Sequence, residues 1–132
     1  KLWVASDAPD TDFFVRLCDV YPDGRSFNLC EGRLRARFRE SFRQEKLLQP
    51  GEVCALDLDL WSTSIIFNQG HRLRVQVTSS SAPGFDPNPN TGEPFRHSAA
   101  TRVARNTVYC DAGHPSQLLL PVVTVERKPG GS

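Results

Sequence analysis

The sequence predicts an all-β domain built as a β-sandwich or jelly roll. Apolar residues recur with a period of two in several segments, as they do in strands that bury one face. Helical periodicity is scarce, and glycine, proline and asparagine separate the alternating segments at short intervals. A chain of 132 residues, 39% of them hydrophobic, is long enough for one domain with its own core.

The strands can be placed in order from their apolar residues and from the turns between them. Tyr21 to Gly24 is a turn sequence with strand-like residues on both sides, and Gln49 to Gly51 and Asn68 to Gly70 precede later strands. We therefore predict strands near residues 2–6, 12–20, 25–31, 33–39, 53–60, 72–79, 101–110 and 117–125.

The fifth and sixth predicted strands show most clearly which side chains face the core. In 53–60 the inward face carries Cys54, Leu56, Leu58 and Leu60. In 72–79 the inward face carries Leu73, Val75 and Val77, and the outward face carries Arg72, Arg74 and Gln76. Asp57 and Asp59 lie on the outward face of the fifth strand, where we expect cross-strand ion pairs with arginines such as Arg35, Arg37, Arg72 and Arg74.

The connecting segments differ in character. Residues 40–48 are compatible with a short helical turn or an irregular loop. Residues 81–98 hold four prolines, which predicts a long irregular loop of the kind that is commonly functional or interfacial. We expect one sandwich domain over residues 1–127 and a flexible tail over 128–132.

Net charge and hydropathy exclude several classes of partner. The formal charge of +1 gives no field of one sign, so neither nucleic acid nor an acidic membrane surface is an expected partner. Apolar runs such as Leu118 to Leu120 are far shorter than the roughly 18 residues of a membrane span. The sequence begins at Lys1 and contains no methionine, so we expect it to be a piece of a longer protein.

The four cysteines show no metal-binding spacing. A two-residue hairpin loop would place Cys18 opposite Phe27, and a three-residue loop with a glycine bulge would place it opposite Asn28. Neither register pairs Cys18 with Cys30. We favour free thiols in a reducing, cytoplasmic compartment over one or two disulfides.

No catalytic residue can be assigned from the sequence. A GxSxG nucleophile motif is absent, and the serine run from Ser79 to Ser81 is read as turn chemistry. The pair Asp57 and Asp59 is explained by strand alternation, although a small hydrolase would use such a pair as acid and base. His71, His97 and His114 lack metal-ligand spacing, so no cofactor or metal site is expected.

Three further patterns have both a binding and a structural interpretation. Arg33, Arg35, Arg37 and Arg39 alternate along one predicted strand, and we expect them to be partly solvated and partly bonded to carboxylates of a neighbouring domain. Asp86, Asn88 and Asn90 alternate like calcium ligands, but the twelfth position of that loop is His97 instead of a glutamate. Trp3 and Trp61 could stack on sugars, although core or interdomain packing is favoured.

Five ordered motifs resemble a known family. They are similar to the C-terminal domain shared by X-Pro dipeptidyl-peptidases, cocaine esterase and α-amino-acid ester hydrolases, and they cover about residues 2–125: Ser6 to Phe13, Val20 to Ser26, Gly32 to Arg37, Gly70 to Val75 and Asn88 to Gly92. The resemblance implies a galactose-binding-like jelly roll that is non-catalytic and packs against an α/β-hydrolase domain carrying a Ser-Asp-His triad. Family members usually have further strands upstream, so the first strands of the sandwich are expected to be missing here.

The resemblance leads to our main hypothesis, which is an accessory domain of a serine hydrolase acting on esters or X-Pro peptides. Its role would be to pack on the catalytic domain and shape the active site. We expect the structural or docking positions to be His71, Arg72, Phe85, Asp86, Asn88, Asn90, Gly92 and Phe95. The alternative is a jelly-roll carbohydrate-binding module. An apolar patch that causes self-association, up to a homo-oligomer, is expected where a partner domain is missing.

Overall fold

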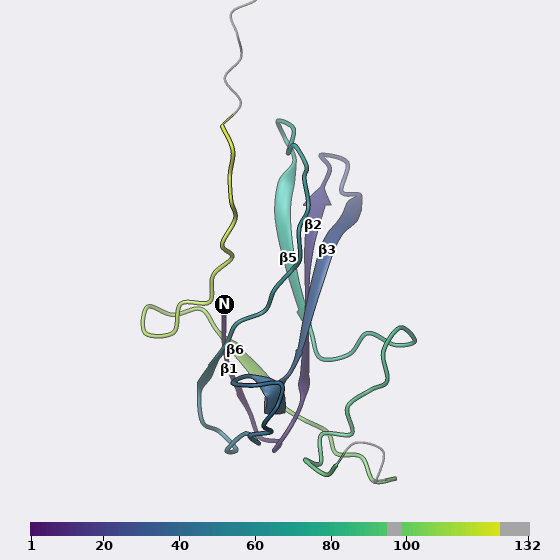
Figure 1. The fold of residues 1–132 in the computed structure, drawn as a ribbon. Coiled ribbons are helices and arrows are strands. Elements are labelled where there is room, and N and C mark those ends of the chain that lie inside the picture. The colour runs from purple at the N-terminus through teal and green to yellow at the C-terminus, as the bar shows by residue number, and fades with distance from the viewer. Residues whose placement is uncertain (95–98, 125–132) are drawn as a thin grey trace, which may run out of the picture.

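The computed structural model describes residues 1–94 and 99–124 and contains two three-stranded antiparallel sheets. The first has the order β4-β1-β6 and the second the order β3-β2-β5 (Figure 1). The elements are β1 (Leu2–Ser6), β2 (Asp12–Val20), β3 (Ser26–Arg35), the 3-10 turn η1 (Ala36–Phe38), β4 (Cys54–Leu56), β5 (Arg72–Thr78) and β6 (Asn106–Tyr109). Two antiparallel sheets with almost no helix confirm the predicted all-β sandwich.

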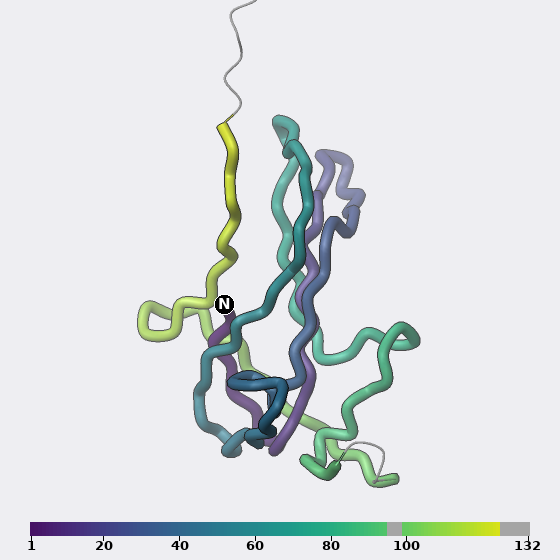
Figure 2. Tube along the Cα trace, viewed as in Figure 1, coloured from purple at the N-terminus to yellow at the C-terminus, as the bar shows by residue number. Residues whose placement is uncertain are grey.

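The β4-β1-β6 sheet has the shorter strands, and we call it the short sheet. The core lies between it and the part of the β3-β2-β5 sheet where β2 begins and β3 ends (Figure 2). Its buried cluster comprises Leu2, Val4, Phe13, Val15, Leu34 and Leu56, with Cys54, Leu58, Leu60 and Val77 packed against it. Burying one such aliphatic or aromatic side chain contributes roughly 1.5–3 kcal/mol. The predicted inward face of residues 53–60 is therefore confirmed, although only Cys54–Leu56 pair as a strand.

Strand β3 corrects the prediction of two separate strands at 25–31 and 33–39. Gly32 lies within the strand opposite Val15 and does not interrupt it. A Cβ atom at Gly32 would lie 2.4 Å from the backbone oxygen of Asp59, so glycine is required because another chain segment passes directly above it. The strand ends at Arg35, and η1 replaces the rest of the predicted second strand.

The later predicted strands are shorter than the sequence suggested. Residues 101–110 form a strand only over Asn106–Tyr109, with an isolated bridge from Cys110 to Pro115, and 72–79 pair over Arg72–Thr78. Residues 117–124 form no strand, and residue 125 lies outside the described part of the chain. Residues 40–48 form an irregular loop.

The hairpin between β2 and β3 places Cys18 opposite Asn28, with a register shift between Leu17 and Cys18. This is the register expected for the longer hairpin loop with a bulge. All four cysteines are free.

The open part of strand β5 differs from the prediction of a buried inward face. Leu73 is 49% exposed and Val75 is 44% exposed, and only Val77 reaches the core. The alternation along β5 is correct, but the short sheet does not extend far enough to cover the first half of the strand (Figure 1).

Within the described residues, no helix is long and apolar enough to cross a membrane.

Candidate domain interface

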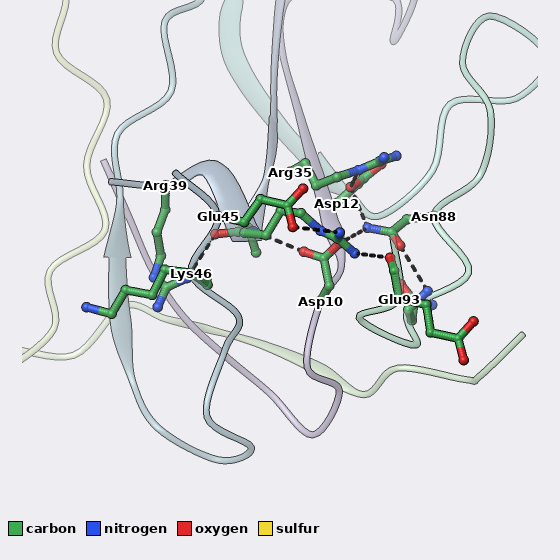
Figure 3. Close-up of polar contacts among 11 residues, drawn as sticks. Asp10, Asp12, Arg35, Arg39, Glu45, Lys46, Asn88 and Glu93 are labelled. Carbon is green, nitrogen blue, oxygen red and sulfur yellow. Dashed lines mark hydrogen bonds and ion pairs between the residues drawn. The ribbon is translucent and has the colours of Figure 1, made fainter. Parts of the chain in front are cut away.

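A buried polar network lies between the start of β2 and residues 81–94, which we call the Pro-rich loop (Figure 3). Its members share hydrogen bonds among two carboxylates, two guanidinium groups and one side-chain amide. We call this set the anchoring network; it consists of Asp10, Asp12, Arg35, Arg37 and Asn88.

Arg37 and Asp10 form the centre of the anchoring network. Arg37 Nε donates to Asp10 Oδ2 at 2.8 Å, and the Arg37 backbone N–H donates to Asp10 Oδ1 at 3.0 Å. The two side chains are 5% and 0% exposed. Arg37 Nη2 also donates to the backbone oxygen of Glu93 at 2.9 Å, which attaches the end of the Pro-rich loop to this pair. A buried charge needs such compensation, because an unpaired ion in the interior is strongly destabilising.

Asn88 joins the two aspartates from the side of the Pro-rich loop. Its Nδ2 donates to Asp10 Oδ2 and to Asp12 Oδ1, both at 2.8 Å. Arg35 holds Asp12 with two hydrogen bonds, from Nε at 2.8 Å and from Nη2 at 3.0 Å. These bonds to Asp12 raise the pKa of the Arg35 guanidinium above its usual value.

The end of strand β3 explains why Arg37 points inward. After Arg35 the backbone leaves the strand geometry, and the Ala36 N–H donates to the Thr11 oxygen at 2.9 Å. The predicted row of four arginines on one side of a strand is therefore wrong. Arg37 is buried, and Arg39 instead donates to backbone oxygens, including that of Ala36 at 3.0 Å.

The expected carboxylate partners of these arginines also need correction. The bonded carboxylates belong to this domain and not to a neighbouring one, since Asp10 and Asp12 hold Arg37 and Arg35. Asp57 and Asp59 are not those partners either. Asp57 lies 3.9 Å from Lys1 Nζ, and Asp59 Oδ1 accepts a hydrogen bond from the Trp61 N–H at 2.8 Å.

Asn90 and Gly92 fix the second half of the Pro-rich loop. Asn90 has a φ of 62°, and its Nδ2 donates to the backbone oxygen of Arg102 at 2.9 Å. Gly92 has a φ of 76°, and a Cβ atom there would lie 3.0 Å from Pro9. Asn90 thus bonds the loop to the chain at Arg102, and at Gly92 any side chain would be strained and would meet Pro9.

Phe85 and Asp86 line a cleft at the first half of the Pro-rich loop. The Phe85 ring lies 5.5 Å from the ring of Phe14, and the guanidinium carbon of Arg33 lies 3.8 Å from the centre of the Phe85 ring. The cleft has a volume of about 470 Å³. We call it the Phe85 cleft; its lining includes Phe14, Arg33, Phe38, Phe42, Phe85 and Asp86.

His71 and Arg72 lie at the opposite end of strand β5 from the Pro-rich loop. His71 Nδ1 lies 2.8 Å from Asp19 Oδ1, and its ring centre is 4.2 Å from that of Tyr21. The His71 and Asp19 side chains are both largely buried, so His71 connects the start of β5 to β2. Arg72 is exposed on β5, and its role in docking stays a prediction.

An open apolar groove of about 660 Å³ lies between the two sheets. Its floor and walls include Leu17, Val75, Val77, Leu58, Leu60, Val108 and Leu118. Trp61 stands at this groove, is 82% exposed and has a φ of 65°, a left-handed backbone conformation that is costly for any residue but glycine. The expected exposed apolar patch is therefore present. Trp61 lines a largely apolar groove, which favours packing over sugar stacking.

The remaining predicted positions concern a possible nucleophile, an undescribed segment and metal binding. Ser81 Oγ accepts a hydrogen bond from Arg16 Nη2 at 2.9 Å and belongs to the start of the Pro-rich loop. Phe95 and His97 lie outside the described residues. Among the residues that are described, no group of three His, Cys, Asp or Glu side chains could hold a metal ion.

Residue patterns did not identify Asp10, Asp12, Arg35 and Arg37 as one cluster. The available signal was the pair of aspartates two residues apart just before a strongly apolar strand, where Asp12 begins β2. Such residues are also ordinary turn formers, so the pattern alone does not reveal that their partners come from residues 35–37 and 88.

Comparisons with known proteins agree with this architecture. The family described as the X-Pro dipeptidyl-peptidase C-terminal non-catalytic domain matches residues 1–119. Cocaine esterase of Rhodococcus sp. (strain MB1 Bresler) is 40% identical over 125 residues, which cover 93% of this chain and 22% of that protein.

Two solved structures are similar in fold as well as in sequence. A selenomethionine-labelled α-amino acid ester hydrolase is 32% identical with a TM-score of 0.77, and the match covers 82% of this chain and 20% of that one. An aminopeptidase from a marine sediment Thaumarchaeota archaeon is 33% identical with a TM-score of 0.82, covering 86% and 21%. The chain thus spans about a fifth of the length of these relatives. It belongs to the family of X-Pro dipeptidyl-peptidase C-terminal non-catalytic domains.

Proposed function

We propose that this domain packs on the α/β-hydrolase catalytic domain of a longer parent protein and shapes the active site of that hydrolase, which acts on esters or X-Pro peptides. The apolar groove carries the proposal. Val75 lines the groove, Leu73 lies two residues before it on β5, and the described residues leave both largely exposed, although the same strand reaches the core at Val77. A face of this kind is typical of a surface covered by other polypeptide.

The Pro-rich loop is the part of the domain that we assign to shaping the active site. The anchoring network holds it at Asn88 and Glu93, and Asn90 holds it again at Arg102. A loop fixed at three points presents its exposed residues in one conformation, as a wall beside a substrate requires. Hydrolysis itself is assigned to a serine of the catalytic domain, outside this chain.

Docking through the apolar groove is tested by placing a charge at Val75. In the isolated chain Val75→Glu should lower the free energy of unfolding by no more than about 1 kcal/mol, because Val75 is half exposed there. In the parent protein the same change should cost several-fold more, about 3 kcal/mol, and reduce activity, because the carboxylate would be buried in an apolar contact. Equal small losses in both proteins would contradict the proposal.

The matched control is Arg74→Glu, one residue away on the opposite face of β5, which we expect to change stability and activity little in either protein. The assignment of chemistry is tested separately with a fluorophosphonate probe and intact mass. The parent should be labelled and this chain should not. Labelling of this chain would place an activated serine within its 132 residues.

A further inference from the structure

We propose that the Phe85 cleft binds a small zwitterion with an aromatic side chain, either a free aromatic amino acid or a short peptide that carries one. This goes beyond the docking role, because it assigns a ligand to a surface that the described chain forms by itself. Three observations carry it: a cation and an anion that form no ion pair within the described residues, and aromatic walls, all lining one cleft of about 470 Å³. Small-molecule sites commonly have volumes of about 300–1,000 Å³.

The cation of the Phe85 cleft is Arg33. Its guanidinium group lies over the Phe85 ring at 3.8 Å, is exposed, and has no carboxylate partner within residues 1–94 and 99–124. The neighbouring Arg35 is different, since Asp12 accepts two of its hydrogen bonds. Stacking on Phe85 holds the Arg33 group in one plane while leaving its N–H donors available for a ligand carboxylate.

The anion of the cleft is Asp86, which directly follows Phe85. Its carboxylate is exposed and makes no ion pair or hydrogen bond within the described residues, although its charge helps to raise the pKa of the nearby Arg35 guanidinium. Asp12, the other acid in the lining, is already held by Arg35 and Asn88. Among the described lining residues, Arg33 and Asp86 are thus the two charged side chains whose hydrogen-bonding atoms are not already engaged, and one positive and one negative group match the carboxylate and the ammonium of a zwitterion.

Aromatic rings form the walls of the cleft. Phe42 is 82% exposed, and its ring stacks on that of Phe38 with 6.4 Å between centres. The Phe85 ring packs against the ring of Phe14, with 5.5 Å between the ring centres. An aromatic side chain placed between these rings would bury surface that is otherwise in water and could add edge or stacking contacts. An aliphatic side chain would gain less.

The test is saturation-transfer NMR on the 132-residue chain, and on the parent protein in parallel, with L-phenylalanine and with glycyl-L-phenylalanine as probes. We expect saturable binding with a Kd on the order of 1 mM for the better probe, as is ordinary for a ligand of this size. Stronger binding of the dipeptide identifies a peptide as the source, and stronger binding of the amino acid identifies the free zwitterion. Absence of saturable binding of both probes up to about 10 mM overturns the proposal.

Variants locate the site and test its two charges. Arg33→Gln and Asp86→Asn should each weaken binding about tenfold, because each removes a charge-assisted hydrogen bond. Phe42→Ala should weaken it several-fold, and its exposure makes a folding defect improbable as the cause. The control Arg74→Gln removes an exposed arginine outside the cleft and should leave binding unchanged. Equal weakening by Arg33→Gln and Arg74→Gln would overturn the assignment.

Truncated probes separate a zwitterion site from a simpler anion site. 3-Phenylpropanoate lacks the ammonium group, and 2-phenylethylamine lacks the carboxylate. Both should bind at least several-fold more weakly than L-phenylalanine, and Asp86→Asn should not weaken 3-phenylpropanoate further. If 3-phenylpropanoate binds as well as L-phenylalanine, Asp86 has no role and the zwitterion assignment is wrong.

Discussion

At the anchoring network the buried charges find their partners inside the domain, whereas at the apolar groove the side chains of β5 face open space. Asp10 and Arg37 are almost fully buried and bond to each other, to Asn88 and to the backbone of Glu93. Leu73, Val75 and Trp61 have large exposed surfaces. Within the described residues, the buried charges of the first region are paired, whereas the apolar side chains of the second are not covered.

This difference separates residues whose contacts lie within the domain from residues that would act through a partner under the proposed docking role. Substitutions in the anchoring network should lower the free energy of unfolding of the isolated chain, because the hydrogen bonds that they remove lie within it. Substitutions at the groove should be tolerated in the isolated chain, because little is buried there. Measurements of the free energy of unfolding and of thiol reactivity test this division.

The largest effect is expected for Arg37→Ala. It would leave the Asp10 carboxylate buried without its main partner, so the free energy of unfolding should fall by about 3–5 kcal/mol. Urea denaturation followed by circular dichroism measures the change. The matched control is Arg74→Ala at an exposed position, where a change of no more than about 0.5 kcal/mol is expected. Similar values for the two variants would remove the distinction between the regions.

Asn88→Ala should have the next largest effect. The substitution removes one amide that donates to two carboxylates, so both Asp10 and Asp12 lose a hydrogen bond in a buried site. We expect a loss of about 2–3 kcal/mol in the same urea experiment. Proteolytic cleavage within the Pro-rich loop should become faster at the same time, because Asn88 connects that loop to β2. Faster cleavage at the 21–25 hairpin loop instead would argue against a local anchoring role.

Trp61→Gly should act in the opposite direction in the isolated chain. Trp61 has a positive φ and is 82% exposed, so glycine relieves backbone strain and gives up little burial. We expect stability to rise by about 0.5–1 kcal/mol, after allowing for the greater freedom of glycine in the unfolded chain. Thermal unfolding measures it. A clear loss of stability would show that Trp61 is already packed in this chain, contrary to the comparison.

The smallest effect concerns thiol reactivity and distinguishes the free groove from a covered one. Burial raises the pKa of the Cys54 and Cys30 thiols, which lowers the share of reactive thiolate near pH 8. Cys110 is exposed and lines the apolar groove, so iodoacetamide should modify it first in the isolated chain. Peptide mapping over time gives the rates. In the parent protein Cys110 should be protected, and unchanged reactivity there would count against a covered groove.

Much of the fold could be predicted from local pattern. Strand β2 and strand β1 have the predicted bounds, and Leu56, Leu58 and Leu60 share the inward face that alternation indicated. These features depend on side-chain period, which a sequence displays directly. The family was also identified from its motifs, and the comparisons confirm it.

The errors arose where distant segments decide local structure. Gly32 is needed because the chain at Asp59 passes over it, and nothing within residues 25–39 signals that contact. Arg37 turns inward because η1 follows β3 and because Asp10 accepts its hydrogen bonds. Leu73 and Val75 have the alternation of buried residues, yet they are exposed here, since alternation shows which face is apolar and not what covers it.

The anchoring network also has a consequence for the order in which the domain folds. Asp10 and Asn88 are separated by 78 residues, whereas β2 and β3 meet across a short hairpin. Long loops close late because their ends must first lose chain entropy, so the hairpin is expected to form before Asn88 arrives. Until then Arg37 and Arg35 can already hold the carboxylates of Asp10 and Asp12, and water takes the place of the Asn88 amide. During synthesis on a ribosome Asp10 would lack its bond to Asn88 until the 78 residues that separate the two had been added.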